Sequence, residues 1–115
     1  GASGIGVDSS YGALRVARRN IKTLNLTERI KIIHGSFANK NLTDEKFDII
    51  VSNPPYIAYG DTRMNDGAMH DPKCALYAKN NGLSAYEQIA QNAKNWIKPN
   101  GRIYLEIGAG QKTAV

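Results

Sequence analysis

The sequence contains a single cysteine and no long apolar run. Cys74 has no second cysteine with which to form an internal disulfide, which is typical of a chain that works in a reducing cytoplasm. No segment approaches the ~18 consecutive apolar residues that a membrane-spanning helix needs, and the chain does not open on a signal-peptide pattern. We therefore predict a cytoplasmic protein that has no membrane partner.

Motifs for metal binding and for covalent catalysis are also missing. His34, His70 and Cys74 do not have the spacing of metal ligands. The sequence has no nucleophile elbow, no Walker loop and no Cys-x-x-Cys pair. These absences argue against a metal site and against the reactions that such motifs perform.

Size and composition indicate an ordinary small domain. The 115 residues suffice for one domain at most. A hydrophobic content of 42% supports a packed core, and 22% charged residues are typical of a soluble surface. The net charge of +5 and the pI near 9.4 are compatible with work near nucleic acid or ribosomes, although many small enzymes are basic.

The hydrophobic pattern predicts four strands and two helices. Short apolar runs favour strands, and apolar residues that recur every three or four positions, such as Leu14, Ala17 and Ile21, favour helices. The predicted order is strand, helix, strand, strand, helix, strand, over residues 3–7, 11–25, 30–34, 47–51, 84–97 and 102–107. Helices between hydrophobic strands are typical of a largely parallel sheet covered by helices. The sequence therefore predicts a doubly wound α/β fold.

Turn and capping residues set the predicted boundaries. Ser9-Ser10 offers N-cap candidates for the first helix, and Ser84 to Glu87 has the S-x-x-E spacing of a capping box for the second. Pro99-Asn100-Gly101 is expected to end that second helix and turn the chain. Gly60 to Asn81 has no clear period and is predicted to be a long functional or mobile loop. The expected buried stripe of the second helix comprises Tyr86, Ile89, Ala90, Ala93 and Trp96 or Ile97.

Four basic residues of the first predicted helix lie on a different face from its apolar residues. They are Arg15, Arg18, Arg19 and Lys22. Such a face is more often solvated than bound, and the alternative is contact with RNA or another partner of a basic patch. We predict a solvated face and no direct nucleic-acid binding.

The chain is organised around Phe47 to Tyr56, FDIIVSNPPY. Phe47 to Val51 is short, apolar and β-branched, and it is predicted to be a buried strand. Pro54 and Pro55 fix φ and remove two backbone donors, and Asn53 is pushed out of the helical region because it precedes a proline. The result is a stiff corner at the carboxyl end of a strand, where ligands bind in open α/β sheets.

This corner could hold a planar nitrogen that carries two N–H groups. The Asn53 side-chain oxygen and the Pro54 carbonyl could each accept one N–H, while the Tyr56 ring flanks the planar group. The arrangement favours loss of conjugation, so that the nitrogen lone pair points at an incoming electrophile. The predicted substrate group is a carboxamide or an exocyclic amine, and the predicted catalytic residues are Asn53, Pro54, Pro55 and Tyr56.

A second candidate site follows the first predicted strand. Asp8 stands at a strand end before a helix, where the ribose hydroxyls of nucleotide-type cofactors bind, although a carboxylate there could instead interact with the helix dipole. Its two oxygens suit a pair of vicinal hydroxyls. Phe37 could pack against an adenine ring, or it could be a core residue. Glu106 to Gly110 looks like a strand with a glycine-rich loop, but a turn or strand end is the better interpretation.

Taken together, these motifs resemble the HemK/PrmC family, the N5-glutamine methyltransferases of peptide chain release factors. Residues 47–57, FDIIVSNPPYI, are similar to the family signature. The NPPY tetrapeptide alone is shared with DNA and RNA amino-methyltransferases, whereas the Leu-Glu-Ile-Gly and Asp-Pro segments are more particular to HemK/PrmC. The other matching segments follow in the family's order, namely Gly6 to Asn20, Asp71-Pro72, Ala75-Leu76, Gly82 to Tyr86, Leu105 to Gly108 and Gln111.

The resemblance implies a class I (Rossmann-like) methyltransferase fold, with a mostly parallel sheet, flanking helices and S-adenosylmethionine as the methyl donor. It implies that Asp8 binds the ribose and that Phe37 takes the place of the family's usual Trp beside the adenine. Asn53 to Tyr56 would hold the glutamine side chain of the release factor's Gly-Gly-Gln loop, and Asn53 would also contact the cofactor. Ser9 and Ser36 complete the expected cofactor site, where the family usually has an apolar residue and an Asp or Asn.

The family's glycine-rich loop, which cradles the methionine part of the cofactor, is expected before Asp8 and is not in this sequence. Neither are its N-terminal helical domain and its final pair of strands. We therefore expect residues 1–115 to be an incomplete methyltransferase catalytic domain that is inactive alone and binds S-adenosylmethionine poorly. The family's first strand lies between the Asp8 and Asn53 strands, so its absence predicts a gap, a re-paired sheet or an edge that dimerises. Two alternatives stay open: a DNA or RNA adenine amino-methyltransferase, and a truncated domain without turnover.

Overall fold

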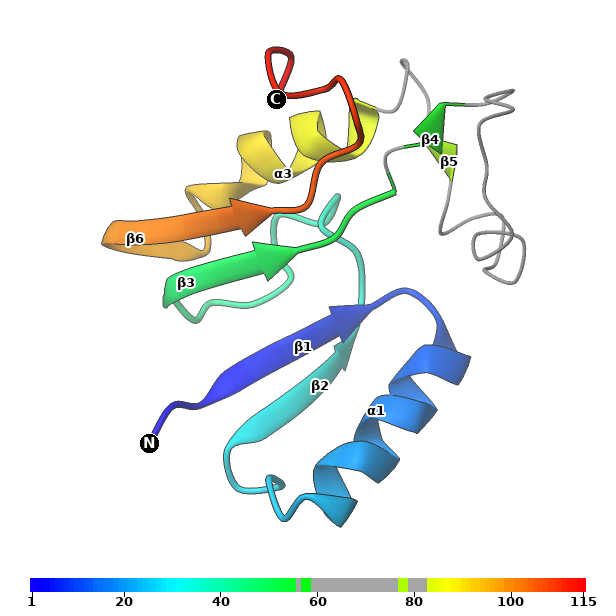
Figure 1. Cartoon of the computed structure of the whole chain (residues 1–115). Coiled ribbons are helices and arrows are strands. Elements are labelled where there is room, and N and C mark those ends of the chain that lie inside the picture. The colour runs from blue at the N-terminus through cyan, green and yellow to red at the C-terminus, as the bar shows by residue number, and fades with distance from the viewer. Residues whose placement is uncertain (56, 59–76, 79–82) are drawn as a thin grey trace. The chain divides into compact units, whose positions relative to one another are not determined.

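A computed structural model describes residues 1–55, 57–58, 77–78 and 83–115. In this described part the elements follow one another in the order β1, α1, β2, β3, β4, β5, α3 and β6 (Figure 1). Backbone contacts divide the chain into two compact units, Gly1–Leu42 and Thr43–Val115. Each unit combines parallel strands with a helix, so the predicted α/β class is confirmed.

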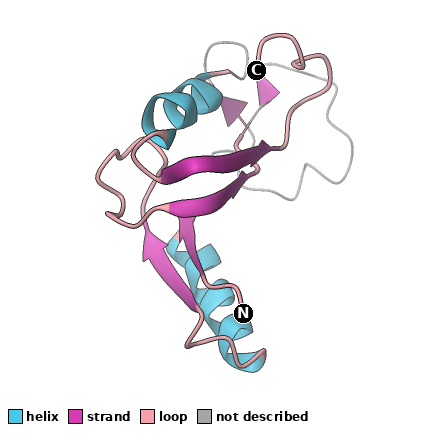
Figure 2. Ribbon diagram, turned by 90° about the vertical axis from the view of Figure 1, so that its left-hand side faces the viewer, coloured by secondary structure: helices cyan, strands magenta, loops and turns pink. Residues whose placement is uncertain are grey.

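In the first unit, one helix joins two parallel strands. β1 (Gly4–Asp8) pairs with β2 (Ile30–His34) without interruption along both strands. The helix between them, α1 (Tyr11–Thr23), lies along this pair of strands (Figures 1 and 2). Parallel strands start at the same end of the sheet, and therefore need such a crossover. Leu14 of α1 is 1% exposed and marks the centre of the core of this unit.

Local geometry sets both ends of α1. Ser10 is the N-cap, as predicted, and its Oγ accepts a hydrogen bond from the Ala13 N–H at 3.3 Å. The helix ends at Thr23, short of the predicted boundary at Asn25. Asn25 adopts a left-handed φ of 55°, a conformation that an α-helix cannot continue through.

The second unit contains another parallel pair and another helix. β3 (Phe47–Ser52) pairs with β6 (Ile97–Leu105), and α3 (Ser84–Ala93) lies alongside them (Figures 1 and 2). The predicted place of Ala90 in the buried stripe is wrong, because Ala90 is exposed and Ala85 is buried in its stead. Among the described residues of this unit, the buried hydrophobic core comprises Ala85, Tyr86, Ile89, Ala93 and Trp96.

The predicted capping box of α3 is wrong, although the helix itself is confirmed. Leu83 is the N-cap and makes no side-chain hydrogen bond, so Ser84 is already the first helical residue. The helix ends at Ala93 and does not continue to Ile97. The next turn is tighter, because the N–H groups of Asn95 and Trp96 each donate to a carbonyl three residues earlier.

β6 begins earlier than predicted and contains an irregularity. The predicted strand covers residues 102–107, whereas β6 starts at Ile97 and its register shifts opposite Phe47 to Ile49. The extra residues are those around Pro99-Asn100-Gly101, where Asn100 has a left-handed φ of 65°. The predicted turn is therefore a bulge inside the strand.

β3 is covered on one face only. Ile50 is half-buried, whereas Ile49 and Val51 are 57% and 76% exposed. Exposed and half-buried residues alternate here because successive side chains of a strand point to opposite faces. The prediction of a fully buried strand is therefore wrong for the face that carries Val51.

A short third pair joins β4 (Ile57–Ala58) to β5 (Tyr77–Ala78), again in parallel. β5 falls within the stretch predicted to be a long loop, Gly60 to Asn81. Apart from β5, that stretch lies outside the described residues, as does Tyr56. Within the described part, no helix has the length and apolar character needed to cross a membrane.

Candidate functional site

The carboxylate of Asp8 lies at the carboxyl end of β1. Its side chain is exposed, and Oδ1 accepts a hydrogen bond from the Ser10 N–H at 2.7 Å. The Asp8 carbonyl accepts another from the Gly35 N–H at 3.0 Å, which continues the β1–β2 ladder beyond the strand ends. Oδ2 has no hydrogen-bond partner among the described residues, so it can accept a bond from a ligand hydroxyl.

The loop between β1 and α1 is held from the neighbouring strand. Nε2 of His34 lies 3.0 Å from the Ser9 carbonyl oxygen. The His34 ring also stacks on Tyr11, with ring centroids 3.9 Å apart and planes 12° from parallel. Sequence reasoning considered His34 only as a metal ligand and did not single out Tyr11. The one available signal was their placement, since each stands where an element meets the predicted ligand-binding edge.

Ser36 and Phe37 follow β2 directly. Both residues are half-buried. The Ser36 Oγ accepts a hydrogen bond from the Ala38 N–H at 3.2 Å, and its carbonyl accepts one from the Asn39 N–H at 3.0 Å. The Ser36 hydroxyl therefore shapes a local turn. Phe37 is the aromatic residue of this loop, and its ring is of the kind that stacks against a planar group.

Asn53, Pro54 and Pro55, here called the proline corner, follow β3 in the second unit. The Asn53 side chain is exposed, and its amide has no hydrogen-bond partner among the described residues. Pro54 is buried and Pro55 half-buried, so the rings anchor the backbone while the preceding amide stays accessible. The Ser52 carbonyl accepts a bond from the Glu106 N–H at 3.0 Å, which extends the β3–β6 pairing to the edge of the corner.

Glu106 to Gly110, the segment after β6, forms a strand end followed by turns, as the sequence predicts. The Gly108 N–H donates to Oε1 of Gln111 at 3.0 Å. The Tyr86 hydroxyl donates to the Glu106 carbonyl at 2.9 Å and lies 3.3 Å from the same Gln111 oxygen. The Gln111 side chain thus closes this turn from within the second unit.

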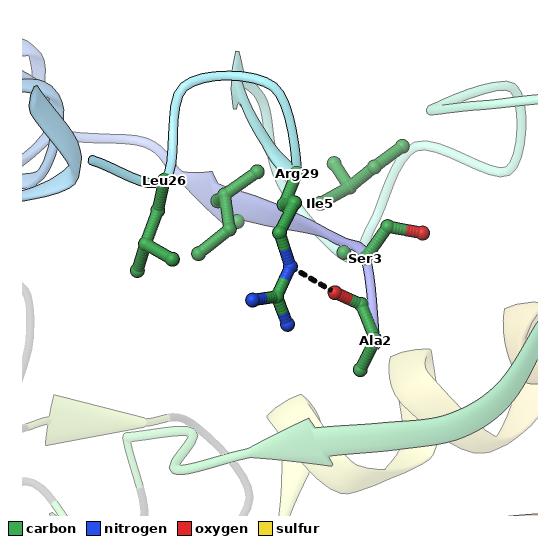
Figure 3. Close-up of a pocket in the computed structure, with 8 residues that line it drawn as sticks. Ala2, Ser3, Ile5, Leu26 and Arg29 are labelled. Carbon is green, nitrogen blue, oxygen red and sulfur yellow. Dashed lines mark hydrogen bonds between the residues drawn. The ribbon is translucent and has the colours of Figure 1, made fainter. Parts of the chain in front are cut away.

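A shallow pocket lies at the opposite end of β1 from Asp8. Ala2, Ser3 and Ile5 line it from β1 and the residues before it, and Leu26 and Arg29 line it from the approach to β2 (Figure 3). The Arg29 Nε donates to the Ala2 carbonyl at 2.8 Å, so the arginine joins the two sides of the hollow. Ligands of parallel sheets bind at the carboxyl ends of strands, and this pocket is at the amino end. It is not the predicted cofactor site.

The predicted site residues are divided between the two units. Asp8, Ser9, Ser36 and Phe37 belong to the first, and Asn53 to Pro55 belong to the second. In both units they stand at or directly after the carboxyl end of a strand in a parallel pair. In the described ranges, no cluster of three or more His, Cys, Asp or Glu side chains could hold a metal ion.

A parallel α/β arrangement with polar residues at strand ends defines a class of cofactor-dependent domains. A family model described as a methyltransferase domain matches residues 1–110, so the chain belongs to the methyltransferase-domain family. Membership confirms the predicted class I methyltransferase fold.

More particular relatives carry the resemblance further. The chain is 46% identical over 113 residues to a bifunctional methyltransferase of Rickettsia felis, in a match that covers 96% of the chain. It is 40% identical over 116 residues, or 99% of the chain, to a release factor glutamine methyltransferase of Caulobacter vibrioides. It is 45% identical over 112 residues, or 94% of the chain, to that of Lactococcus lactis. The resemblance to HemK/PrmC is confirmed.

These relatives are much longer than the chain. The matched region is 21% of the Rickettsia felis protein. It is 40% of the Caulobacter vibrioides protein and 39% of the Lactococcus lactis protein. The activities in their names are therefore activities of longer polypeptides.

Proposed function

We propose that residues 1–115 are part of a catalytic domain that transfers a methyl group from S-adenosylmethionine to the glutamine of the Gly-Gly-Gln loop of a peptide chain release factor. The acceptor is the side-chain amide nitrogen. The supporting observation is the exposed Asn53 amide, without a partner among the described residues, directly after a strand of a parallel pair. Relatives at 37–45% identity that are named release factor glutamine methyltransferases support this substrate. The proposed substrate and the single cysteine both favour the cytoplasm.

Asn53 and Pro54 supply the acceptors of the proposed substrate site. The Asn53 side-chain oxygen accepts one N–H of the glutamine amide, and the Pro54 carbonyl accepts the other. Burial of the Pro54 ring keeps this carbonyl in place, and Pro55 prevents the chain from entering a helix. Tyr56 flanks the planar amide. Holding both N–H groups weakens conjugation with the carbonyl, so the nitrogen lone pair becomes available without a strong base.

The residues of the first unit suit a nucleoside-type cofactor. Asp8 offers a carboxylate oxygen that no described residue occupies, which fits a ribose hydroxyl. Phe37, a half-buried residue, supplies an aromatic ring for the adenine, and Ser9 and Ser36 stand beside Asp8 and Phe37 in the sequence. Bound there, S-adenosylmethionine would supply a methyl group activated by the positive charge on sulfur.

The distribution of charge favours one alternative substrate. Residues 1–42 contain seven basic residues (Lys and Arg) and two acidic residues (Asp and Glu). Residues 43–115 contain eight basic and eight acidic residues. The whole net charge of +5 therefore lies in the first unit. The exocyclic amine of adenine also presents two N–H groups to an acceptor pair. DNA or RNA adenine is therefore the second candidate. Its support is weaker, because the Leu-Glu-Ile-Gly segment and the named relatives favour the release factor.

A methyl-transfer assay separates these candidates. The encoded polypeptide that contains these residues is incubated with labelled S-adenosylmethionine and with a release factor, DNA or RNA. We expect label on the release factor alone. Asn53→Ala should lower the rate by about 100-fold to 1,000-fold, as loss of one preorganised polar group does. The matched control Asn20→Ala removes an exposed amide of α1 and should leave the rate unchanged. Label on nucleic acid would establish the alternative, and no transfer to any of the three would indicate a domain without turnover.

A further inference from the structure

Two aromatic rings lie beside the strand end that carries Asp8. Tyr11 is the first residue of α1, and His34 is the last residue of β2 and the register partner of Asp8. The two rings stack with centroids 3.9 Å apart and an interplanar angle of 12°. Tyr11 is 72% exposed, so the stack lies at the surface and does not fill the core. Leu14, which is 1% exposed, instead anchors α1 in the core.

The imidazole of His34 reaches the Asp8 carboxylate through one peptide group. Nε2 lies 3.0 Å from the Ser9 carbonyl oxygen, and because a carbonyl can only accept, Nε2 carries the proton. The N–H at the other end of that peptide belongs to Ser10, and it donates to Oδ1 of Asp8 at 2.7 Å. A peptide group is planar, so a bond that fixes its C=O direction also fixes the direction of its N–H.

We propose that His34, held in place by Tyr11, is a positioning residue that orients the Asp8 carboxylate for the ribose hydroxyls of the cofactor. This inference rests on the proposed function, in which Asp8 binds the ribose. Without the His34 bond, the Ser9–Ser10 peptide can rotate, and the Ser10 N–H no longer holds Oδ1. The carboxylate then samples other rotamers, and Oδ2 loses its fixed direction. The Asp8 backbone stays in place, because the Gly35 N–H binds its carbonyl at 3.0 Å.

A purely structural role for the stack makes a different prediction. If Tyr11 and His34 only fasten α1 to β2, their loss weakens the binding of every nucleoside ligand to the same extent. If they orient Asp8, their loss weakens only ligands that carry the ribose hydroxyls. The ratio of two affinities therefore distinguishes the two roles, whatever the change in overall stability.

The first experiment measures that ratio in the encoded polypeptide that contains these residues. Calorimetric titration compares S-adenosylhomocysteine with its 2′,3′-dideoxy analogue. We expect His34→Ala to weaken S-adenosylhomocysteine binding about fivefold to tenfold, as the loss of one hydrogen bond does. Binding of the dideoxy analogue should stay unchanged. Tyr11→Ala should act in the same direction, whereas Tyr11→Phe keeps the ring and should keep the ratio. His34→Gln retains an N–H near the Nε2 position and should restore part of it.

Equal weakening of both ligands by His34→Ala would overturn the inference. Asp8→Asn shows separately whether the proposed function holds, because it should abolish the preference for the ribose hydroxyls. If Asp8→Asn leaves that preference intact, the ribose assignment fails, and the second experiment decides on the His34 bond.

The second experiment needs no ligand. In ¹⁵N-labelled protein, the Ser10 amide should exchange slowly with solvent, because it donates a short hydrogen bond. His34→Ala should accelerate its exchange and shift its resonance, while the Leu14 amide, which donates to the Ser10 carbonyl at 3.0 Å, should keep its protection. An unchanged Ser10 amide in His34→Ala would show that His34 does not act on Asp8 through this peptide.

Discussion

Tyr86 connects α3 to the segment after β6 through one hydroxyl group. The ring is 5% exposed, and the hydroxyl donates to the Glu106 carbonyl at 2.9 Å. We expect Tyr86→Phe to lower the free energy of unfolding by about 1 kcal/mol, because the partly buried hydrogen bond to the Glu106 carbonyl is lost while the packing of the ring is kept. Urea denaturation measures the change. Tyr104→Phe is the matched control: Tyr104 is 49% exposed and should change stability by less than about 0.5 kcal/mol. Equal effects of the two substitutions would contradict this account.

Some of the site residues can be identified from the sequence alone, and others cannot. Asn53, Pro54 and Pro55 are adjacent, and the two prolines restrict the backbone whatever lies around them. Asp8 is recognisable because it stands at the junction of a strand and a helix. The stack of His34 on Tyr11 is not recognisable in the sequence, since only the pairing of β2 with β1 brings the two residues together.

At the scale of elements, Gly101 lies where β6 bulges against β3. A Cβ at this position would be 2.5 Å from Cγ1 of Ile97, and 3.0 Å and 3.1 Å from the carbonyl oxygens of Lys98 and Asp48. Backbone atoms cannot move aside as a flexible side chain can. We therefore expect Gly101→Ala to lower the free energy of unfolding by about 1–3 kcal/mol, as overpacking does.

The control for Gly101→Ala is another strand glycine. A Cβ added at Gly4 of β1 would meet no heavy atom within 4 Å. Gly4→Ala should therefore change the free energy of unfolding by less than about 0.5 kcal/mol in the same denaturation experiment. A loss as large as that of Gly101→Ala would mean that the bulge geometry is not the cause.

An ion pair also joins β3 to β6. Nζ of Lys98 lies 2.8 Å from Oδ2 of Asp48, and this hydrogen bond and charge lower the pKa of the Asp48 carboxyl below its ordinary value. A carboxyl whose pKa is lower in the folded state adds stability above its unfolded pKa and loses it as the pH falls through the folded pKa.

This sign gives a testable pH dependence. At neutral pH, Asp48→Asn should be slightly less stable than the natural chain. The difference should vanish once the pH has fallen through the lowered folded-state pKa of Asp48, because the carboxyl is then protonated in both states. The effect should be small and sensitive to salt, because both groups are exposed. Lys98→Met should remove the same contribution, and the double variant should lose little more. A difference that persists at low pH would show that another interaction is responsible.

At the scale of the whole molecule, the two units differ in charge and in what they contribute. The first carries the entire net charge and the proposed cofactor residues, and the second is neutral and carries the proline corner. Arg15, Arg18, Arg19 and Lys22 are all exposed on α1, and within the described part of the chain none of them forms an ion pair. The solvated face stays a prediction, because a face that binds RNA or another partner would also be exposed in the free chain.

The cofactor affinity of the 115-residue chain is predicted to be low. The resemblance to HemK/PrmC implies a glycine-rich loop before Asp8, and these residues do not contain it. We expect calorimetric titration of the chain with S-adenosylhomocysteine to give binding weaker than micromolar, because the resemblance implies that this loop holds the methionine part of the ligand. Micromolar binding that is lost in Asp8→Ala would show instead that these residues suffice.

The sequence by itself determined the features that depend on neighbours along the chain. Apolar periodicity predicted the helices and the parallel α/β class, Ser10 was recognisable as an N-cap, and the predicted bounds of β2 are confirmed. The predictions from the sequence that are wrong include the bounds of α3 and β6. Ser84 does not cap α3, and Pro99 to Gly101 form a bulge because β6 already pairs with β3 at Ile97.

Only the tertiary structure decided which distant groups meet. The pairing of β1 with β2 brings His34 to the Ser9 carbonyl, and the pairing of β3 with β6 brings Lys98 to Asp48, 50 residues away. The tertiary structure also leaves Val51 exposed, although the composition of β3 indicates burial. Composition sets how much free energy burial would release, but whether a residue is buried depends on what packs against it, and no local pattern records that.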